Sequence, residues 1–423
     1  MQVYKFGGAS IKDSRAINNI ASIIDNGKKS TLVIVVSAMG KITNLLEKVT
    51  QAFIGKHPDL QLYMHELKQY HLTIINELFA NNTNTEVYRL FEHEFDHLNN
   101  VLDNEPSLNY NFDYDQIVHF GEIFSSIIIS CYLNYKGYHN KLINIKKVLI
   151  TDSNFRDAKI NFEVSQNLAR NTFLLEPDMI YVTQGFIGAD INNLPTTLGR
   201  EGSDYSAAAL AYLLNINELT IWKDVDGIYN ADPKKFDKAT LLPKISYREA
   251  IELAYFGAKV IHPKTIQPIQ NKNIKLYVKS FYHPNLPGTV ITNENEASKP
   301  EVPIYILKEN QILISIWPKD FSFVAEENLG HIFSLMAKFR IQANLIQNSA
   351  INFSICCDNS SDKIPAFTTA VKQTYNMLYN SNLELLTIRH YTAESIDLFT
   401  SGKKLFIQQL SRSTARFVMS VNI

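Results

Sequence analysis

The sequence is poor in the features that mark secreted, membrane-bound or nucleic-acid-binding proteins. It has only three cysteines in 423 residues and no CxxC pair, so a disulfide framework is excluded and a reduced, cytoplasmic protein is expected. No basic segment followed by an apolar stretch opens the chain, and the longest apolar run, at residues 123–133, is too short and too hydroxylated to span a bilayer. The formal net charge is −1, so no global field would attract nucleic acid or an anionic membrane.

Two common templates for phosphoryl transfer are also missing. No segment matches the P-loop pattern GxxxxGK[ST], and the HRD and DFG elements of protein kinases are absent. The segment "HEFDH" at residues 93–97 does match the HExxH pattern of zinc metalloproteases. On a helix, however, His93 and His97 would lie on the flank of the apolar stripe, and no third ligand is evident nearby. We therefore expect no protein-bound metal and no protease.

Strand and helix patterns alternate over the first two-thirds of the chain. With 423 residues, of which 45% are hydrophobic, about two or three domains with a large core are expected. Short β-branched runs predict strands near residues 2–6, 31–37, 179–188, 218–225 and 274–281. The region from 57 to 136 is helical with one gap, so its helices should cover one side of the sheet. This order predicts the α/β class, with a three-layer αβα domain and a mostly parallel sheet.

The pattern changes after residues 293–303, where hydrophobicity falls and two prolines appear. This segment is the best linker candidate in the chain. Beyond it the order βαββαβ predicts a smaller α+β domain with an antiparallel sheet, and the tail adds one or two strands. The expected organisation is a domain at 1–292, a linker at 293–303 and a second domain at 304–423.

Four polar clusters follow predicted strands, at residues 5–10, 37–44, 196–204 and 223–236. In an open α/β sheet, ligands bind beyond the carboxyl ends of the strands, and glycines with helix N-termini there favour anions. A single cluster is weak evidence, because tight turns need glycine anyway. Four together indicate a site for a polyphosphate.

Charged residues near these clusters suit particular ligand groups. Lys5 and Lys259 are point cations suited to phosphate oxygens, whereas the planar fork of Arg200 suits a carboxylate. Glu122 begins an apolar helix and has two interpretations. It is either a favourable charge at the positive helix end or a counter-charge for a substrate ammonium.

The chain contains, in this order, the segments "KFGGAS", "SAMGKITN", "FGE", "VTQGFIG", "TTLGREGSDYSAAALA", "KDVDGIYNADP" and "FGAKVIHPKTI". Together these segments resemble the aspartate kinases of the amino acid kinase family. The region after residue 300 resembles the ACT domain attached to these kinases. The resemblance implies transfer of a phosphoryl group from ATP, with Mg²⁺, to the side chain of L-aspartate. This reaction is the first step towards lysine, threonine and methionine. A homodimer and an amino-acid effector are further family-level expectations.

The resemblance also implies roles for individual residues. Lys5 would neutralise the transferring phosphoryl group and Asp204 would organise the site around it. The expected aspartate-binding residues are Ser37, Thr43, Glu122, Arg200 and Ser203. The expected ATP-binding residues are Lys5, Gly7, Gly8, Ser10, Lys223, Asp224, Tyr229, Lys234 and Lys259. Because the acceptor carboxylate has a reference pKa near 3.9, it is ionised at neutral pH, and charge neutralisation rather than a general base is needed.

Some residues depart from the family pattern. Ala9 and Glu201 stand where other residues are usual, as do Lys223 and Lys234. The C-terminal region holds one complete ACT module and a remnant, which leaves inhibition by lysine or threonine open. A related kinase for another small acid, or a weakly active ACT-dependent amino-acid sensor, are the alternative functions.

Overall fold

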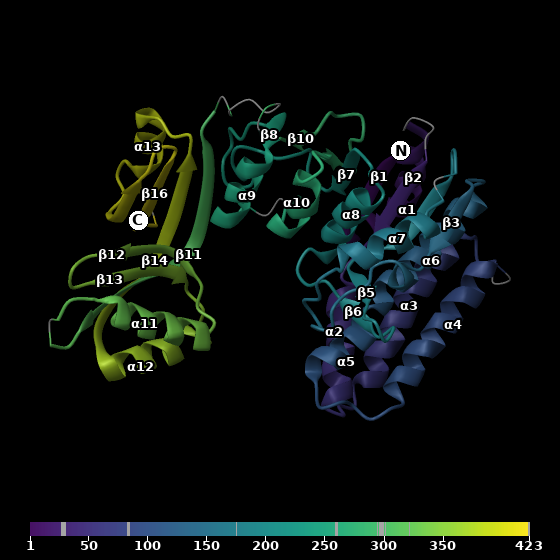
Figure 1. Cartoon of the computed structure of the whole chain (residues 1–423), viewed down its shortest axis with the longest axis horizontal. Coiled ribbons are helices and arrows are strands. Elements are labelled where there is room, and N and C mark those ends of the chain that lie inside the picture. Colours follow the sequence, from purple (N-terminus) through teal and green to yellow (C-terminus); the bar gives the residue numbers. More distant parts are fainter. Residues whose placement is uncertain are drawn as a thin grey trace. The chain divides into compact units, whose positions relative to one another are not determined.

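The computed structural model describes residues 1–26, 31–82, 85–174, 176–258, 261–293, 295, 300, 302–320 and 322–421. Two compact units can be separated (Figure 1). The first comprises Met1–Ile228, Leu241–Ile251 and Val260–Lys299, and the second comprises Tyr229–Thr240, Glu252–Lys259 and Pro300–Ile423. Much of the expected linker at 293–303 lies outside the described residues. No sequence pattern marks the two short inner segments that group with the second unit.

The first unit is built on a mostly parallel sheet, as expected. Among the described residues the sheet has eight strands, and its one antiparallel pair joins β9 and β10. In spatial order the strands are β3 (Asn140–Ile143), β4 (Ile180–Gln184), β2 (Leu32–Val36), β1 (Gln2–Phe6), β7 (Glu218–Lys223), β9 (Lys275–Ser280), β10 (Thr289–Thr292) and β8 (Lys244–Ser246). A separate hairpin joins β5 (Ile187–Ala189) to β6 (Pro195–Thr197).

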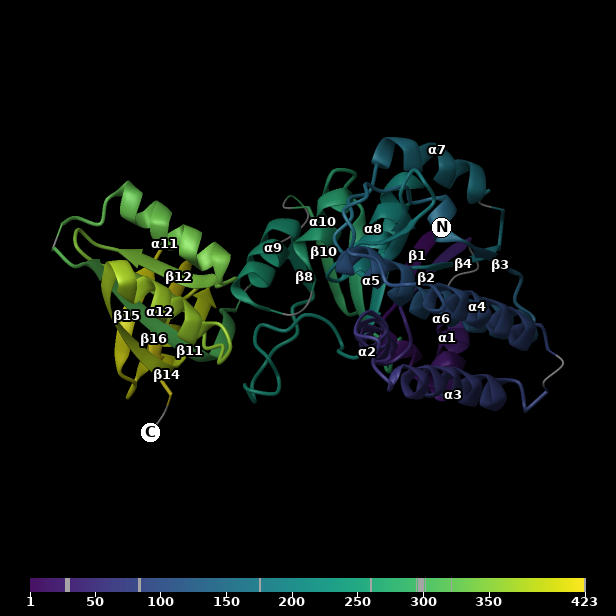
Figure 2. The same ribbon diagram turned by 90° about the horizontal axis from the view of Figure 1, so that it is seen from below.

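Helices cover both faces of this sheet, which confirms the three-layer prediction (Figure 2). One face packs against α7 (Phe162–Thr172), α8 (Gly202–Leu213) and α10 (Pro263–Gln270). The opposite face packs against α1 (Ser14–Asn26), α2 (Ile42–Ile54), α3 (Leu60–Leu78), α4 (Glu86–Leu102), α5 (Tyr110–Val118) and α6 (Phe120–Tyr135). Short 3₁₀ turns η1 (Gly8–Ile11) and η2 (Ile145–Lys147) follow β1 and β3, and α9 (Tyr247–Phe256) follows β8.

Alternation along β1 decides which side chains face which layer. Tyr4 and Phe6 belong to the large core shared with α1 to α6. Because successive side chains in a strand point to opposite faces, Lys5 points to the other side, where α8 contacts β1. A charged side chain is thereby directed towards the N-terminal end of a buried helix.

The helical segment Tyr110–Tyr135, which includes α5 and α6, contains an 18-residue window that is apolar enough by composition to cross a bilayer. The apolar run at 123–133, which is too short by itself, is only the second half of this segment. In the folded protein 83% of the 18-residue window is buried. Burial within the first unit therefore accounts for its composition as that of a core helix.

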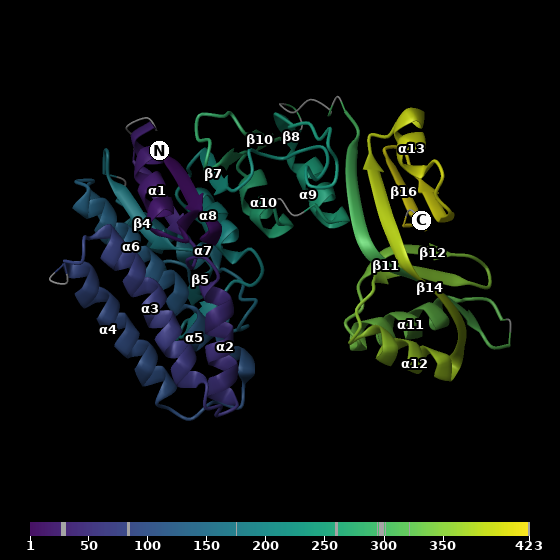
Figure 3. The ribbon, with the colours of Figure 1, turned by 180° about the vertical axis from the view of Figure 1, so that it is seen from behind.

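The second unit contains an antiparallel sheet of six strands within the described residues. Its elements are β11 (Ile304–Pro318), α11 (Glu326–Lys338), β12 (Ala343–Asn348), β13 (Phe353–Asp358), α12 (Ile364–Thr374), β14 (Tyr375–Arg389), α13 (Ala393–Thr400), β15 (Leu405–Leu410) and β16 (Thr414–Ser420). Helices α11 and α12 lie side by side on one face (Figure 3). The βαββαβ order is confirmed, and the tail supplies two further strands.

One helix of the second unit ends before its sequence pattern does. The helical pattern at 362–378 predicts a helix to its end, but α12 stops at Thr374 and a strand starts at Tyr375. Tyr375 pairs with Pro318 of β11, and its ring is buried in the core beneath α11 and α12. Tertiary packing therefore overrides the local helical pattern.

Candidate active site

Loops from the carboxyl ends of β1 and β2 and from the start of α8 meet around one pocket of about 540 Å³ in the first unit. Its lining contains most of the residues expected from the sequence. These are Lys5, Gly7, Gly8, Ser10, Ser37, Thr43, Glu122, Arg200, Ser203, Asp204, Lys223 and Asp224. Residues from all four polar clusters that follow predicted strands therefore line one cavity.

A buried ion pair is part of the lining of this pocket. The Nζ of Lys5 lies 2.5 Å from Oδ1 of Asp204, and the Nζ of Lys223 lies 3.6 Å from Oδ2. Burial alone would raise the pKa of Asp204, but the two ammonium groups hold that pKa below its usual value. Asp204 is thus an anion that positions two cations, and a role as a proton acceptor does not fit it.

Glu122 lies in the first turn of α6 and is 3% exposed. Its Oε1 accepts a hydrogen bond of 3.0 Å from the backbone N–H of Ala38, while its buried Oε2 has no hydrogen-bond partner among the described residues. Burial raises the pKa of Glu122 to about 8, against the opposing effects of the Ala38 N–H and the Lys5 charge. A buried carboxylate oxygen without a partner, in a pocket, is suited to a ligand donor.

The loop before α8 is closely fitted to its surroundings. Gly199 and Glu201 adopt positive φ angles of 75° and 54°, which bend the chain sharply into the helix. At Gly185, which follows β4, an added Cβ would lie 2.7 Å from the Cβ of Ser203. The N-terminus of α8, with Ser203 and Asp204, therefore sits against a backbone position that accepts only glycine without a shift.

Three residues expected around ATP are not among the lining residues. Tyr229 and Lys234 lie on the segment Tyr229–Thr240, which groups with the second unit. Lys259 lies outside the described residues. The sequence pattern alone did not indicate this grouping.

Other lining residues were missed by the sequence analysis, namely Tyr114, Arg156, Phe186, Thr197 and Trp222. Thr197 lies within the glycine-rich cluster at 196–204, so its position was a usable signal. Tyr114 and Arg156 come from segments with no strand-end glycine pattern, and only the tertiary fold brings them to the pocket.

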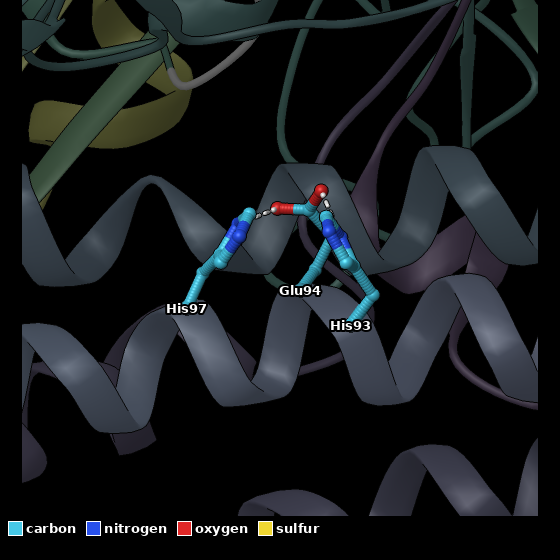
Figure 4. A group of neighbouring side chains, drawn as sticks. All are labelled: His93, Glu94 and His97. Carbon is cyan, nitrogen blue, oxygen red and sulfur yellow. Dashed lines mark hydrogen bonds and ion pairs between the residues drawn. The ribbon is translucent and has the colours of Figure 1, made fainter.

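The HExxH match lies on α4, outside the lining of this pocket (Figure 4). His93 and His97 are exposed, as expected for the flank of the helix, and their side chains are 58% and 51% accessible. Glu94 lies between them, with its oxygens 3.3 and 3.4 Å from the two Nδ1 atoms. Glu94 is thus a third possible metal ligand, which the sequence pattern alone did not indicate. The three side chains lie on an open helix surface and not in a protease-like cleft.

Comparison with known proteins agrees with the fold and the pocket. Residues 1–280 match the model of the amino acid kinase family. The chain is 31% identical over 373 residues to lysine-sensitive aspartokinase 3 of Escherichia coli, covering 85% of this chain and 78% of that protein. It is 32% identical over 366 residues to a bifunctional aspartokinase/homoserine dehydrogenase of Buchnera aphidicola, covering 84% of this chain and 44% of that protein.

Solved structures give the same picture. E. coli aspartokinase III in complex with lysine and aspartate superposes with a TM-score of 0.84 at 26% identity, covering 99% of this chain and 95% of that one. The same enzyme in complex with aspartate and ADP gives a TM-score of 0.79 at 25% identity, covering 99% and 96%. The chain spans less than half of the bifunctional relative but most of the monofunctional one. It belongs to the amino acid kinase family, and within that family to the aspartokinases.

Proposed function

We propose that the protein transfers the γ-phosphoryl group of ATP to the side-chain carboxylate of L-aspartate, giving 4-phospho-L-aspartate and ADP. One observation carries this proposal: the ammonium of Lys5, the guanidinium of Arg200 and the buried carboxylate of Glu122 line a single pocket. These groups complement a phosphoryl group, a carboxylate and an ammonium respectively. The aspartokinase relatives support aspartate as the acceptor, because the E. coli enzyme binds it in the solved complexes.

The chemistry needed from the protein is mainly electrostatic. The acceptor carboxylate is ionised at neutral pH, so no general base is required. Two anions must instead approach one another, and Lys5, held by Asp204, is placed to offset the charge of the transferring group. Glu122 would hold the substrate ammonium, Arg200 a carboxylate, and Ser37, Thr43 and Ser203 would add neutral hydrogen bonds.

The nucleotide is proposed to lie along the glycines at residues 7–8 and near Ser10, Lys223 and Asp224. Tyr229, Lys234 and Lys259 remain proposed contacts of ATP on the basis of family resemblance. Mg²⁺ would enter with the nucleotide, since this ion is usually held by substrate phosphates and one or two carboxylates. Because Asp204 already pairs with two lysines, the phosphates of ATP would supply most of the ligands of Mg²⁺. The ion would reduce the repulsion between ATP and the aspartate carboxylate.

The decisive experiment is a coupled assay of ADP release with L-aspartate and L-glutamate side by side, with and without EDTA. The proposal expects Mg²⁺-dependent turnover with aspartate and at least tenfold lower kcat/KM with glutamate, since the pocket must discriminate one methylene. Equal or greater activity with glutamate would assign a different acceptor. No ADP release with either acid would refute the kinase activity.

The similarity to the aspartokinases also supports proposals about regulation and assembly. The E. coli relative is named for its lysine sensitivity, and we propose that the second unit of this protein binds an amino acid. A thermal-shift comparison of lysine, threonine and methionine tests this directly. A homodimer is expected, and light scattering would test it. A reducing cytoplasmic location is also expected, in keeping with the three free cysteines.

A further inference from the structure

Asp115 on α5 ties two segments of the pocket wall together. Its Oδ2 accepts hydrogen bonds from the backbone N–H groups of Thr197 (2.8 Å) and Arg156 (3.0 Å), and its Oδ1 accepts one of 2.6 Å from the Thr197 hydroxyl. Asp115 is fully buried. A buried carboxylate with three donors fixes the backbone on which they lie, so the Arg156 backbone is held in place from α5.

The backbone at Arg156 has a conformation that arginine disfavours. The N–H of Asp157 donates to the carbonyl of Asn154 at 3.2 Å, which closes a turn with Arg156 as its third residue. Arg156 has a φ of +71°, a value that such turns normally reserve for glycine. Phe155 of the same turn packs edge-on against Phe112 of α5, with ring centroids 5.2 Å apart. Strained residues concentrate at functional sites, so an arginine in this conformation points to a functional role.

The guanidinium of Arg156 is oriented by aromatic rings, and the charge of buried Asp115 acts on it without forming an ion pair. Its Cζ lies 4.4 Å from the ring centroid of Tyr114 and 5.3 Å from that of Tyr110, and an Nη1 contact of 3.5 Å reaches Asn111. No ion pair to Arg156 occurs among the described residues. Stacking on tyrosine faces orients a guanidinium, and apart from the contact with Asn111 it leaves the in-plane donors available. Arg156 is exposed yet lines the pocket, as Arg200 does.

We propose that Arg156 is a specificity-determining residue that binds a carboxylate of the amino-acid acceptor, alongside Arg200. This inference rests on the proposed aspartate kinase function. An acceptor with two carboxylates and one ammonium carries a net charge of −1. Each of its two carboxylates would then meet one guanidinium, and its ammonium would meet the ionised Glu122. The backbone conformation at position 156 favours glycine, and the arginine found there supplies a side chain that can bind a carboxylate.

The test compares R156G and R156K with wild type and with the control R340G. Arg340 also has a positive φ, 53°, but lies in the second unit beyond α11 and is exposed. R156G removes the guanidinium and relieves the backbone, so it should raise KM for aspartate roughly 10- to 100-fold, the range for a lost charged hydrogen bond. KM for ATP should stay within about twofold, and the melting temperature should not fall. R156K should recover part of the loss, and R340G should leave both KM values unchanged.

The outcomes separate this inference from the proposed function. If the wild type releases no ADP with aspartate, the proposed function fails before any variant is considered. If the wild type is active and R156G keeps its KM for aspartate, the role of Arg156 is overturned while the kinase stands. A lower melting temperature in R156G, with equal losses on ATP and aspartate, would likewise overturn it and assign Arg156 to the fold.

Discussion

The Nζ of Lys5 lies 2.5 Å from Oδ1 of Asp204, and both side chains are almost completely buried. One residue comes from the first strand and the other from the first turn of a helix two hundred positions later. Lys5 is therefore oriented before any substrate binds. A preoriented cation stabilises developing charge without reorganisation during the reaction.

Lys5→Ala should lower kcat by roughly 10²- to 10³-fold with a smaller change in KM, because Lys5 acts on the transferring group. It should also destabilise the protein by about 3 kcal/mol, since a buried carboxylate loses its nearest cation. The double variant K5A/D204N is the matched comparison. It should regain stability in urea unfolding but not kcat. Near-normal kcat in K5A would contradict the role given to Lys5.

Arg200→Ala should mainly weaken aspartate binding. The lost charge-assisted contact predicts a rise in KM for aspartate of roughly tenfold or more, with kcat changed less. Initial-rate measurements at saturating ATP check this, and R200K should recover only part of the loss because lysine lacks the planar fork. An unchanged KM for aspartate, with a raised KM for ATP, would move Arg200 to the nucleotide end.

Aspartate affinity should rise with pH up to about 8, the value to which burial raises the pKa of Glu122. Only the ionised form of Glu122 can pair with the substrate ammonium, so binding releases a proton below that pH. Calorimetry in buffers of different ionisation enthalpy measures this release. Glu122→Gln should bind aspartate weakly and with no such pH dependence between pH 6 and 8.

The same shift affects stability without ligand. Because the pKa of folded Glu122 lies above its ordinary value of 4.5, the folded state binds more protons than the unfolded state between these pH values. The contribution of Glu122 to the free energy of unfolding is therefore full below about pH 4.5 and declines as pH rises towards 8. Urea titrations of wild type and E122Q should converge at low pH and diverge, with E122Q the more stable, at pH 8. Parallel curves would argue against the raised pKa.

Gly185→Ala should displace the start of α8, since its new Cβ would lie 2.7 Å from the Cβ of Ser203. We expect a loss of about 1–3 kcal/mol in unfolding free energy, typical of overpacking, and a fall in kcat. Gly330→Ala is the control. Gly330 lies inside α11 with no atom within 4 Å of the added Cβ, so this change should stabilise the protein by about 0.5–1 kcal/mol.

Replacing both His93 and His97 with alanine should leave kinase activity unchanged. The cluster they form with Glu94 is on the open surface of α4, outside the lining of the pocket. Elemental analysis of the purified protein should find zinc well below one ion per chain. Stoichiometric zinc lost in the double variant would reverse the expectation from the sequence.

Much of the pocket was predictable, because its residues follow directly from strand periodicity and strand ends. Lys5 faces α8 because side chains alternate along β1, and Asp204 meets it because α8 begins at a glycine-rich turn. Arg156 was not predictable in this way. Its place depends on Asp115, a side chain 41 positions earlier, and no local pattern records such a contact.

The second unit shows the same division between local and long-range information. The order of strands and helices in its first module follows from hydrophobic periodicity. The start of β14 at Tyr375 does not, since the residues before it continue a helical pattern. Likewise, Tyr229 and Lys234 sit in a turn-rich stretch whose partners, such as Glu309 for the neighbouring Lys235, lie far along the chain.

Strands β11 and β14 each run for 15 residues and belong to both halves of the six-stranded sheet. One end of β11 pairs with β13, while the other end lies beside the part of β14 that pairs with β16. The two halves of the sheet therefore share two continuous backbones. A ligand that changed the twist of one half would act through these backbones on the strand pairing of the other, so one half can transmit a signal that it does not itself receive.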